Sequence, residues 1–243
     1  MAGGFQKNLF HLPLSCLLLA LALSCVPLLN AQVVLQDNFT YKTPNIDGHA
    51  TTTGPGLWES NSSESSISTD GTQALISLGN GKVGEGQITA NCRFSLNPNT
   101  IYTLKVTFKI KSLNSEGKDV WMAMGFSNPE GGESDDPWVL IRPARTDADE
   151  GVMVALHKRG EEPFGEVRIP AADFTVPLVA SIKWNSSTGK TQYFLNGTLQ
   201  DYEGKTTLPT GDRNIFFQGW QCGNLISVTN VTLTAEPIKA KTK

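Results

Sequence analysis

Residues 177–202 read PLVASIKWNSSTGKTQYFLNGTLQDY, and this stretch decides the fold class. Apolar residues recur at every second position of its first part: Leu178, Ala180, Ile182 and Trp184. This period of two is typical of a strand with one face on a core. The small polar run SSTGK at 186–190 favours a tight reversal, and a second apolar run ends at Asn196-Gly197, a strong hairpin signal. The stretch therefore predicts three strands joined by two tight turns.

The order of these features resembles a known family of domains. A strand, the turn SSTGK, the run YFLNG at 193–197 and a further strand resemble the later hairpins of concanavalin A-like, laminin G-like jelly-roll domains. The opening run VVLQDNF at 33–39 also resembles exported bacterial proteins of this type. The resemblance implies a jelly-roll sandwich. It also implies a function among lectins, glycan-binding modules and some glycoside hydrolases.

The rest of the chain predicts short strands and no helix. Alternation is clearest at 102–111, where one face is apolar and the other carries Thr and Lys, whereas 119–127 is apolar on both faces. Residues 41–72 are rich in turn signals, with a short strand at 57–59. Further strands are expected at 33–39, 73–78, 86–95, 138–144, 151–158, 167–169, 214–221 and 225–234. This spacing predicts an all-β fold, an antiparallel β-sandwich.

The N-terminal segment has the features of a secretory signal peptide. Lys7 is the only Lys, Arg, Asp or Glu before Asp37, and an apolar run rich in Leu ends near Ala31. We expect a signal peptide at 1–31, the sandwich at 32–236 and a short basic tail at 237–243. A lipoprotein anchored at Cys25 is a less favoured alternative, and so is a retained membrane anchor.

The charge balance disfavours nucleic acid as a partner. The chain carries 20 Lys and Arg against 23 Asp and Glu. Loss of residues 1–31 removes only Lys7 and moves the net charge from −3 to −4. A mildly acidic domain lacks the electrostatic footprint of a nucleic-acid-binding protein.

Cys92 and Cys222 are the two cysteines outside the signal peptide. In an exported protein two thiols can form a disulfide, and a long closed loop would stabilise the fold. The alternative is a pair of buried free thiols. Neither cysteine has a second Cys or His at the spacing that a metal site needs.

The sequence offers little support for catalysis. Glycoside hydrolysis requires two neighbouring carboxylates, and the one local approach, residues 133–137 (ESDDP), lacks a second Glu and contains a Pro. No G-x-S-x-G motif is present. We therefore expect no enzyme activity, with a dispersed carboxylate site as the alternative.

Aromatic strands suggest a glycan-binding face. Sugar rings pack on Trp, while polar side chains bind the hydroxyls. Alternation places Trp138 with Arg142 and places Gln218 with Trp220. If the strands are neighbours, one concave face would carry the candidate ligand-binding residues Trp121, Trp138, Arg142, His157, Gln218 and Trp220.

Two acidic loops offer a weak calcium site, built from Asp135, Asp136, Asp147 and Asp149. No D-x-D-x-D-G loop is present, so calcium is only an optional cofactor here. The sequence thus favours an exported, non-catalytic module that binds a carbohydrate or a cell-surface glycan. The alternatives are a glycoside hydrolase or lyase, and a structural surface or matrix protein.

Overall fold

The computed structural model describes residues 30–60, 67–76, 88–110, 120–128, 137–142, 152–157, 165–169, 177–205, 211–220, 222 and 226–239. The chain divides into two units, Met1–Asn30 and Ala31–Lys243. The second unit holds every described strand and the described hydrophobic core. The described residues contain no helix that is long and apolar enough to cross a membrane.

The described strands form two sheets, and every pairing in them is antiparallel. The larger sheet has nine strands in the order β14-β13-β12-β7-β16-β5-β4-β2, with β1 also paired to β16. Its strands are β1 (Gln32–Asp37), β2 (Lys42–Thr43), β4 (Ile67–Asp70), β5 (Ala74–Ile76), β7 (Thr100–Ile110), β12 (Leu178–Asn185), β13 (Lys190–Leu195), β14 (Thr198–Lys205) and β16 (Ile226–Pro237).

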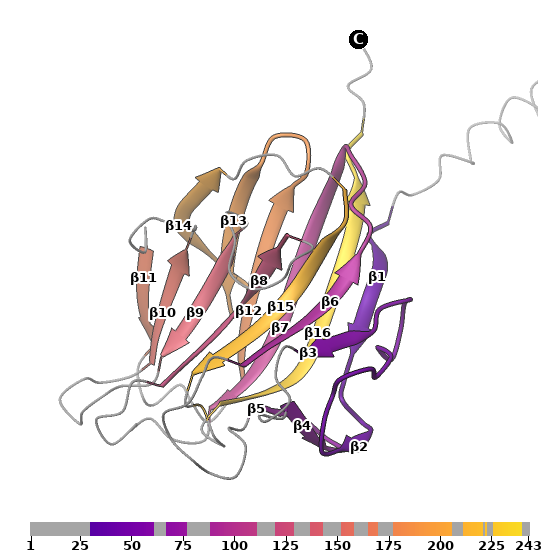
Figure 1. The fold of residues 1–243 in the computed structure, drawn as a ribbon. Helices are drawn as coiled ribbons and strands as arrows, with labels where there is room; N and C mark the ends of the chain where they lie inside the picture. The colour runs from indigo at the N-terminus through magenta and orange to yellow at the C-terminus, as the bar shows by residue number, and fades with distance from the viewer. Residues whose placement is uncertain are drawn as a thin grey trace, which may run out of the picture. The chain divides into compact units, whose positions relative to one another are not determined.

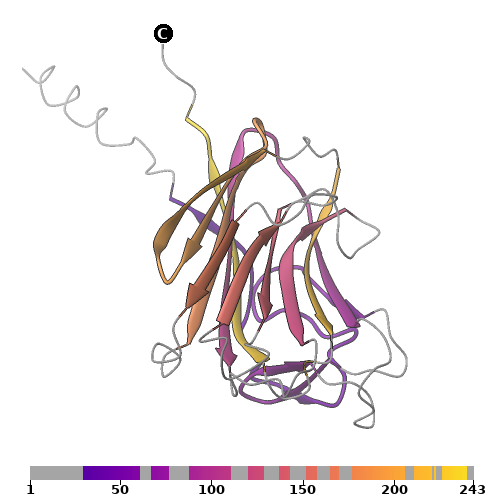
Figure 2. The same cartoon turned by 90° about the vertical axis from the view of Figure 1, so that its left-hand side faces the viewer.

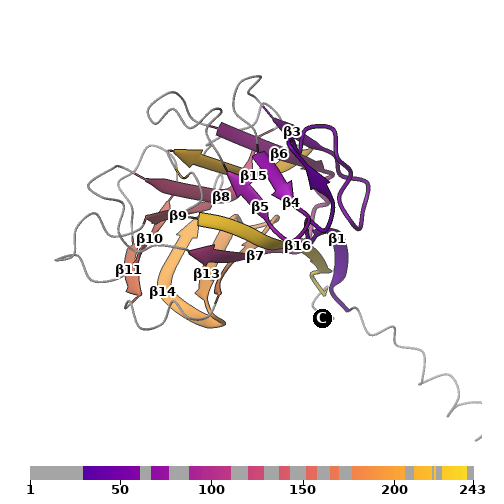
Figure 3. The same ribbon diagram turned by 90° about the horizontal axis from the view of Figure 1, so that it is seen from below.

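The second sheet has seven strands in the order β11-β10-β9-β8-β15-β6-β3, and Figure 1 shows them from left to right. They are β3 (Trp58–Ser60), β6 (Ile88–Phe94), β8 (Trp121–Ser127), β9 (Trp138–Arg142), β10 (Val152–His157), β11 (Gly165–Ile169) and β15 (Arg213–Trp220). Seen from below, the two sheets lie in two layers, with β6, β15 and β8 in one and β13, β7 and β16 in the other (Figure 3). The predicted antiparallel β-sandwich is confirmed.

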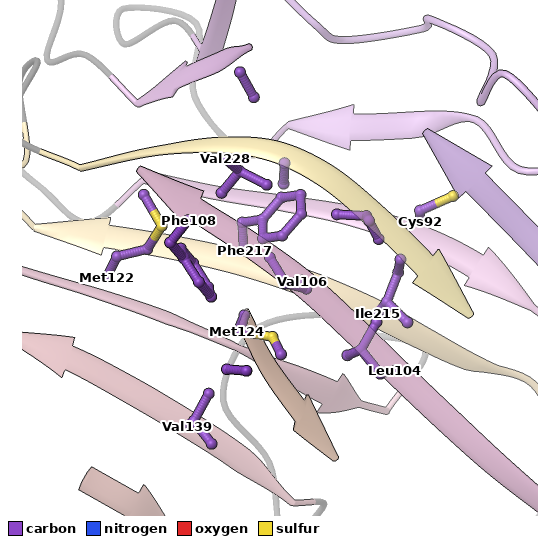
Figure 4. Close-up of a cluster of buried hydrophobic side chains, with 14 of the residues drawn as sticks. Cys92, Leu104, Val106, Phe108, Met122, Met124, Val139, Ile215, Phe217 and Val228 are labelled. Carbon is purple, nitrogen blue, oxygen red and sulfur yellow. The ribbon is translucent and has the colours of Figure 1, made fainter. Parts of the chain in front are cut away.

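The main core fills the space between the two sheets. The nine-stranded sheet contributes Leu104, Val106, Phe108 and Val228, which face residues of the seven-stranded sheet (Figure 4). Those facing residues are Cys92, Met122, Met124, Val139, Ile215 and Phe217. Trp184, expected to be a core residue, has an exposed fraction of 0%. The apolar residues at every second position of β7 and β12 are therefore those that face the core between the sheets.

The hairpins that decided the fold class lie at one edge of the nine-stranded sheet (Figure 2). In the first turn, Asn185 Oδ1 accepts hydrogen bonds from the backbone N–H groups of Ser187 (2.9 Å) and Thr188 (3.0 Å). In the second, Asn196 and Gly197 both have positive φ, 49° and 82°. That geometry matches the twist of the flanking strands, which is why Asn-Gly suits this turn.

The region 41–72 contains more strand than the sequence suggested. It was expected to hold one short strand, and the structure adds β2 and β4. Both are short, of two and four residues, and β2 pairs only with β4. Segments of this length carry too little alternation to be recognised locally, because their pairing depends on β5 and β16.

Candidate functional site

The seven-stranded sheet is apolar on both of its faces at its centre. Along β8, Met122, Met124 and Phe126 point into the inter-sheet core, while Trp121 and Ala123 point to the outer face. The outer-face residues form a second apolar cluster: Trp121, Ala123, Trp138, Leu140 and Phe216. This outer face collects the candidate residues.

The strand registers arrange the outer face in rows that run across the strands. The first row, here called the tryptophan row, contains Arg168, Met153, Arg142, Trp121 and Trp220. The register pairs Arg168 with Met153, Met153 with Arg142, and Trp121 with Trp220. The pairing of Met122 with Ile141 places Trp121 opposite Arg142. Paired residues project to the same face, so this row lies on one side of the sheet.

The second row contains Gln218, flanked on one side by Ala123, Leu140 and Ala155 and on the other by Thr89. Gln218 has an exposed fraction of 5%, and its Oε1 is buried without a hydrogen-bond partner among the described residues. A buried carbonyl oxygen without a donor costs about 1–3 kcal/mol. The row therefore offers an acceptor that lacks a donor.

The third row contains the large aromatic residues Trp138 and Phe216, with Gly125 between them. Their exposed fractions are only 6% and 1%. A Cβ atom at position 125 would lie 2.4 Å from Trp138 Cβ and 2.5 Å from the Pro137 carbonyl oxygen. Glycine is therefore needed for β9 to approach β8 this closely.

The fourth row is polar. Register places Ser127, Asn214 and Arg93 opposite one another on β8, β15 and β6. Asn214 Nδ2 donates a hydrogen bond to the Asn128 carbonyl oxygen at 2.9 Å. Arg93 is exposed. The outer face thus changes from tryptophans and arginines at one end of the strands to amides and a hydroxyl at the other.

The structure brings the candidate residues to one face, as the alternation suggested. Trp121, Arg142 and Trp220 are half-buried and share the tryptophan row, with Gln218 one row away. Trp138 lies beneath the surface and packs against Leu140 and Phe216. For His157 the structure describes the backbone, which pairs with Trp138, but not the side chain.

Sequence reasoning did not single out Arg168, Thr89 or Phe216. Arg168 is exposed, and its neighbour Val167 packs on the main core, which directs position 168 to the outer face. Alternation within 167–169 was visible in the sequence. The missing information was that β11 belongs to the same sheet as the tryptophans.

Carboxylates on the outer face do not form a catalytic pair among the described strands. Register places Glu166 on β11 and Glu59 on β3, the two edges of the sheet. Six strand spacings of about 4.8 Å separate them by about 29 Å. Glycoside hydrolysis needs two carboxyl groups within about 5–9.5 Å.

The calcium site cannot be placed. Asp135, Asp136, Asp147 and Asp149 all lie outside the described residues. Within the part of the chain that is described, no group of three or more His, Cys, Asp or Glu side chains could hold a metal ion. Calcium binding therefore stays a prediction.

The sequence allowed either a disulfide between Cys92 and Cys222 or a pair of buried free thiols, and in the structure both thiols are free and buried. Cys92 pairs with Ile215, whereas Cys222 follows Trp220 at the other end of β15. Five residues of strand already span about 17 Å, far more than a disulfide bridges. Burial raises the pKa of each thiol to about 12, with a further contribution at Cys92 from the Asp37 and Glu59 carboxylates.

Asp37 is a buried carboxylate outside the candidate face, with an exposed fraction of 0%. Its Oδ1 accepts hydrogen bonds from Phe39 N (2.9 Å) and Thr52 Oγ1 (3.1 Å). Its Oδ2 accepts from Trp58 Nε1 (2.7 Å) and Tyr41 O–H (3.0 Å). Burial and the nearby carboxylate raise the pKa of Tyr41, which keeps it a donor. With these four donors in place, Asp37 anchors the segment after β1 through hydrogen bonds within the protein.

Comparison by sequence finds no relative: no protein-family profile and no curated protein matches the chain. Comparison by structure finds many. The chain is similar to a lectin from Bauhinia forficata in complex with GalNAc, at 10% identity and a TM-score of 0.54, covering 86% of this chain and 100% of the lectin. It is similar to the basic winged bean lectin with Tn-antigen, at 10% identity and a TM-score of 0.54, covering 85% and 99%.

A third similar structure is an enzyme. The endo-1,3-beta-glucanase from Streptomyces sioyaensis is 11% identical, with a TM-score of 0.55, over 85% of this chain and 96% of the glucanase. Identities this low show the fold alone. The chain therefore has the concanavalin A-like jelly-roll fold that the hairpin pattern suggested, and this fold is shared by lectins and a glucanase.

Proposed function

We propose that this protein is a non-catalytic carbohydrate-binding module whose ligand lies on the outer face of the seven-stranded sheet. The observation that carries the proposal is the pairing of Trp121 with Trp220, two half-buried tryptophans on adjacent strands, one row from the unsatisfied Gln218. This combination supplies both contacts that a sugar needs, an aromatic platform and a polar anchor.

The tryptophan pair supplies the platform. Directly opposite residues of antiparallel strands have Cβ atoms about 5 Å apart, so the two indoles cover a continuous strip of the face. The C–H-bearing face of a sugar ring packs on such a strip and displaces water from it. Trp138 and Phe216 lie two rows away and are buried, so they support the strip from the side.

Gln218 supplies the anchor. Its Oε1 gains a donor only if a ligand, or a side chain displaced by one, presents an O–H or N–H group. Sugar hydroxyls are donors of this kind. The cost that the free protein bears at Gln218 is thereby recovered on binding.

A glucanase-like activity is the competing function, because a glucanase shares the fold. Against it, the described strands place Glu59 and Glu166 at opposite edges of the face. The same binding experiment separates the two functions when reducing ends are measured beside binding.

The test uses residues 32–243, which contain all described strands, with a panel of polysaccharides in calcium and in EDTA. Binding is followed by intrinsic tryptophan fluorescence. We expect saturable binding without release of reducing ends. Trp220→Ala should weaken it about 10-fold, equivalent to about 1.4 kcal/mol, whereas Trp220→Phe should retain most of it.

The matched control is Phe194→Ala, which removes a half-buried aromatic side chain from the other sheet. It should leave binding unchanged. Release of reducing ends would replace the proposal with a hydrolase, and a complete lack of binding would favour a structural surface protein.

We further propose that residues 1–31 direct export and that the sandwich acts outside the cytoplasm. The apolar, Leu-rich run that ends near Ala31, preceded by Lys7 as the only Lys, Arg, Asp or Glu before Asp37, supports this boundary. N-terminal sequencing of the exported protein should begin at Gln32. A lipid-modified N-terminus at Cys25 would replace this proposal with membrane anchoring.

A further inference from the structure

The tryptophan row ends in arginines rather than in neutral sugar-binding groups. Arg142 lies directly beside Trp121, and Arg168 lies two strands further toward the edge, with Met153 between them. At about 4.8 Å per strand, the four spacings from Arg168 to Trp220 cover about 19 Å. A ligand chain lying across the strands would meet two guanidinium groups and then two indoles.

The described strands place few other charges near this row. The row itself contains no carboxylate. Glu166 occupies the neighbouring row on β11, His157 the third row, and Glu59 and Arg93 lie at the far side of the sheet. Arg168 is exposed, which makes its guanidinium accessible from solvent.

We infer that the ligand of the tryptophan row is an acidic glycan, whose carboxylate or sulfate groups are bound by Arg142 and Arg168 while its rings pack on Trp121 and Trp220. This inference rests on the proposed function and specifies its ligand. Arginine suits the task because its planar guanidinium donates two parallel hydrogen bonds to a carboxylate or sulfate.

Because the protein is negatively charged overall, we expect an acidic glycan to be attracted by the arginines of the tryptophan row rather than by the net charge. The chain has a net charge of −3 and therefore does not attract a polyanion as a whole. Binding must come from the few arginines that the fold gathers at this row. It should consequently depend on individual guanidinium groups and weaken as salt is raised, because screening acts on exposed charges.

The experiment compares two charge-equivalent variants of residues 32–243, Arg168→Gln and Arg93→Gln. Both residues are exposed and lie on the same face, but Arg93 is three rows from the tryptophan row. The probes are a polyuronate, a sulfated galactan and a neutral glucan, each at two salt concentrations. We expect Arg168→Gln to weaken binding of an acidic probe about 10-fold, because charge-assisted hydrogen bonds are lost. Arg93→Gln should leave it unchanged.

Arg142→Lys is the second variant, since it keeps the charge and removes the forked donor geometry. It should also weaken binding of the acidic probe, and unfolding midpoints of all variants confirm that they are folded. A preference for the polyuronate identifies carboxylates as the recognised groups, and a preference for the sulfated galactan identifies sulfates. Either result supports the inference.

Three results would overturn it. Equal losses in Arg168→Gln and Arg93→Gln would mean that general charge, not the row, binds the polyanion. Binding of the neutral glucan alone, sensitive to Trp220→Ala, would leave the proposed function standing and remove the acidic ligand. Binding of none of the probes, nor of any glycan in the wider panel, would remove both.

Discussion

The inner faces of the two sheets are both apolar, whereas their outer faces differ in polarity. On the nine-stranded sheet, the outer positions of β7 and β12 are mostly Thr, Lys, Ser and Asn, with a few apolar residues. Each of these side chains is exposed or partly exposed. On the seven-stranded sheet, the outer positions of β8, β9 and β15 are largely buried and include Trp138, Leu140 and Phe216. The outer face of the nine-stranded sheet is polar and solvated, and the outer face of the seven-stranded sheet is largely apolar.

This difference between the two outer faces bears on the proposed function. A two-layer sandwich needs one apolar face on each sheet, and the inter-sheet core supplies it. The second apolar face of the seven-stranded sheet exceeds that need. Its partly exposed members, Trp121 and Trp220, together with Gln218, whose buried Oε1 lacks a donor, are the residues to which we assign the proposed ligand binding.

The largest expected effect comes from truncating an aromatic ring on each outer face. Phe216→Ala should lower the free energy of unfolding by about 3–5 kcal/mol, because a ring that is 1% exposed leaves a cavity. Phe194→Ala, on the outer face of the nine-stranded sheet, should cost about 1 kcal/mol because the ring is only half-buried. Urea denaturation measures both. Equal losses of unfolding free energy in the two variants would contradict the difference between the two outer faces.

The next effect concerns the close approach of β8 and β9. Gly125→Ala should destabilise the protein by about 2 kcal/mol, because its Cβ would meet backbone atoms of Pro137 and Trp138 that have little freedom to move. The same denaturation assay checks this. A neutral result would mean that the third row is loosely packed.

A smaller effect of opposite sign is expected at Gln218. Gln218→Met should raise the free energy of unfolding by about 1 kcal/mol, because it removes a buried oxygen that lacks a donor. The same change should abolish or strongly weaken glycan binding. Gln192→Met on the other sheet should instead cost a few tenths of a kcal/mol, since Gln192 Nε2 donates to Glu203 Oε1 at 3.3 Å. Destabilisation by Gln218→Met would contradict a ligand-directed role.

The smallest effect at neutral pH concerns the thiols on the inner side of the seven-stranded sheet. The pKa of Cys92 and of Cys222 is raised to about 12 by burial, against about 8.5 in the unfolded chain. The folded state therefore holds protons that the unfolded state loses. Stability from this source is complete below about pH 8 and falls as pH rises toward 12. Denaturation at pH 7 and pH 10 measures the fall.

Thiol reagents provide an independent check on the same residues. In residues 32–243, neither Cys92 nor Cys222 should react with an aromatic disulfide reagent at pH 8 until the protein unfolds, and two thiols should then appear. Rapid reaction of Cys222 in the folded protein would show that the tryptophan end of the sheet opens, because Cys222 Sγ donates to the Trp121 carbonyl oxygen.

Much of the architecture was predictable from local pattern. The strands β7, β12 and β13 and both hairpin turns were predictable from alternation and from the Asn-Gly turn. One face of each of these strands packs on the core and the other faces water, so the pattern is visible in the sequence. The strands β2 and β4 were not predictable, since so few residues carry no periodicity. The sequence could not choose between a disulfide and free thiols at Cys92 and Cys222, because the number of cysteines carries no information about where β15 ends.

The class of fold, the turns, the alternation of each longer strand and the grouping of Trp138 with Arg142 and of Gln218 with Trp220 all follow from the amino-acid sequence. These properties are local, because side chains two residues apart on a strand share a face. The folded structure was needed to show that β11, β9, β8 and β15 belong to one sheet and that Trp121 lies opposite Trp220. Register between distant strands depends on packing of the whole core, so the aromatic and arginine-bearing face exists only once the two sheets have formed.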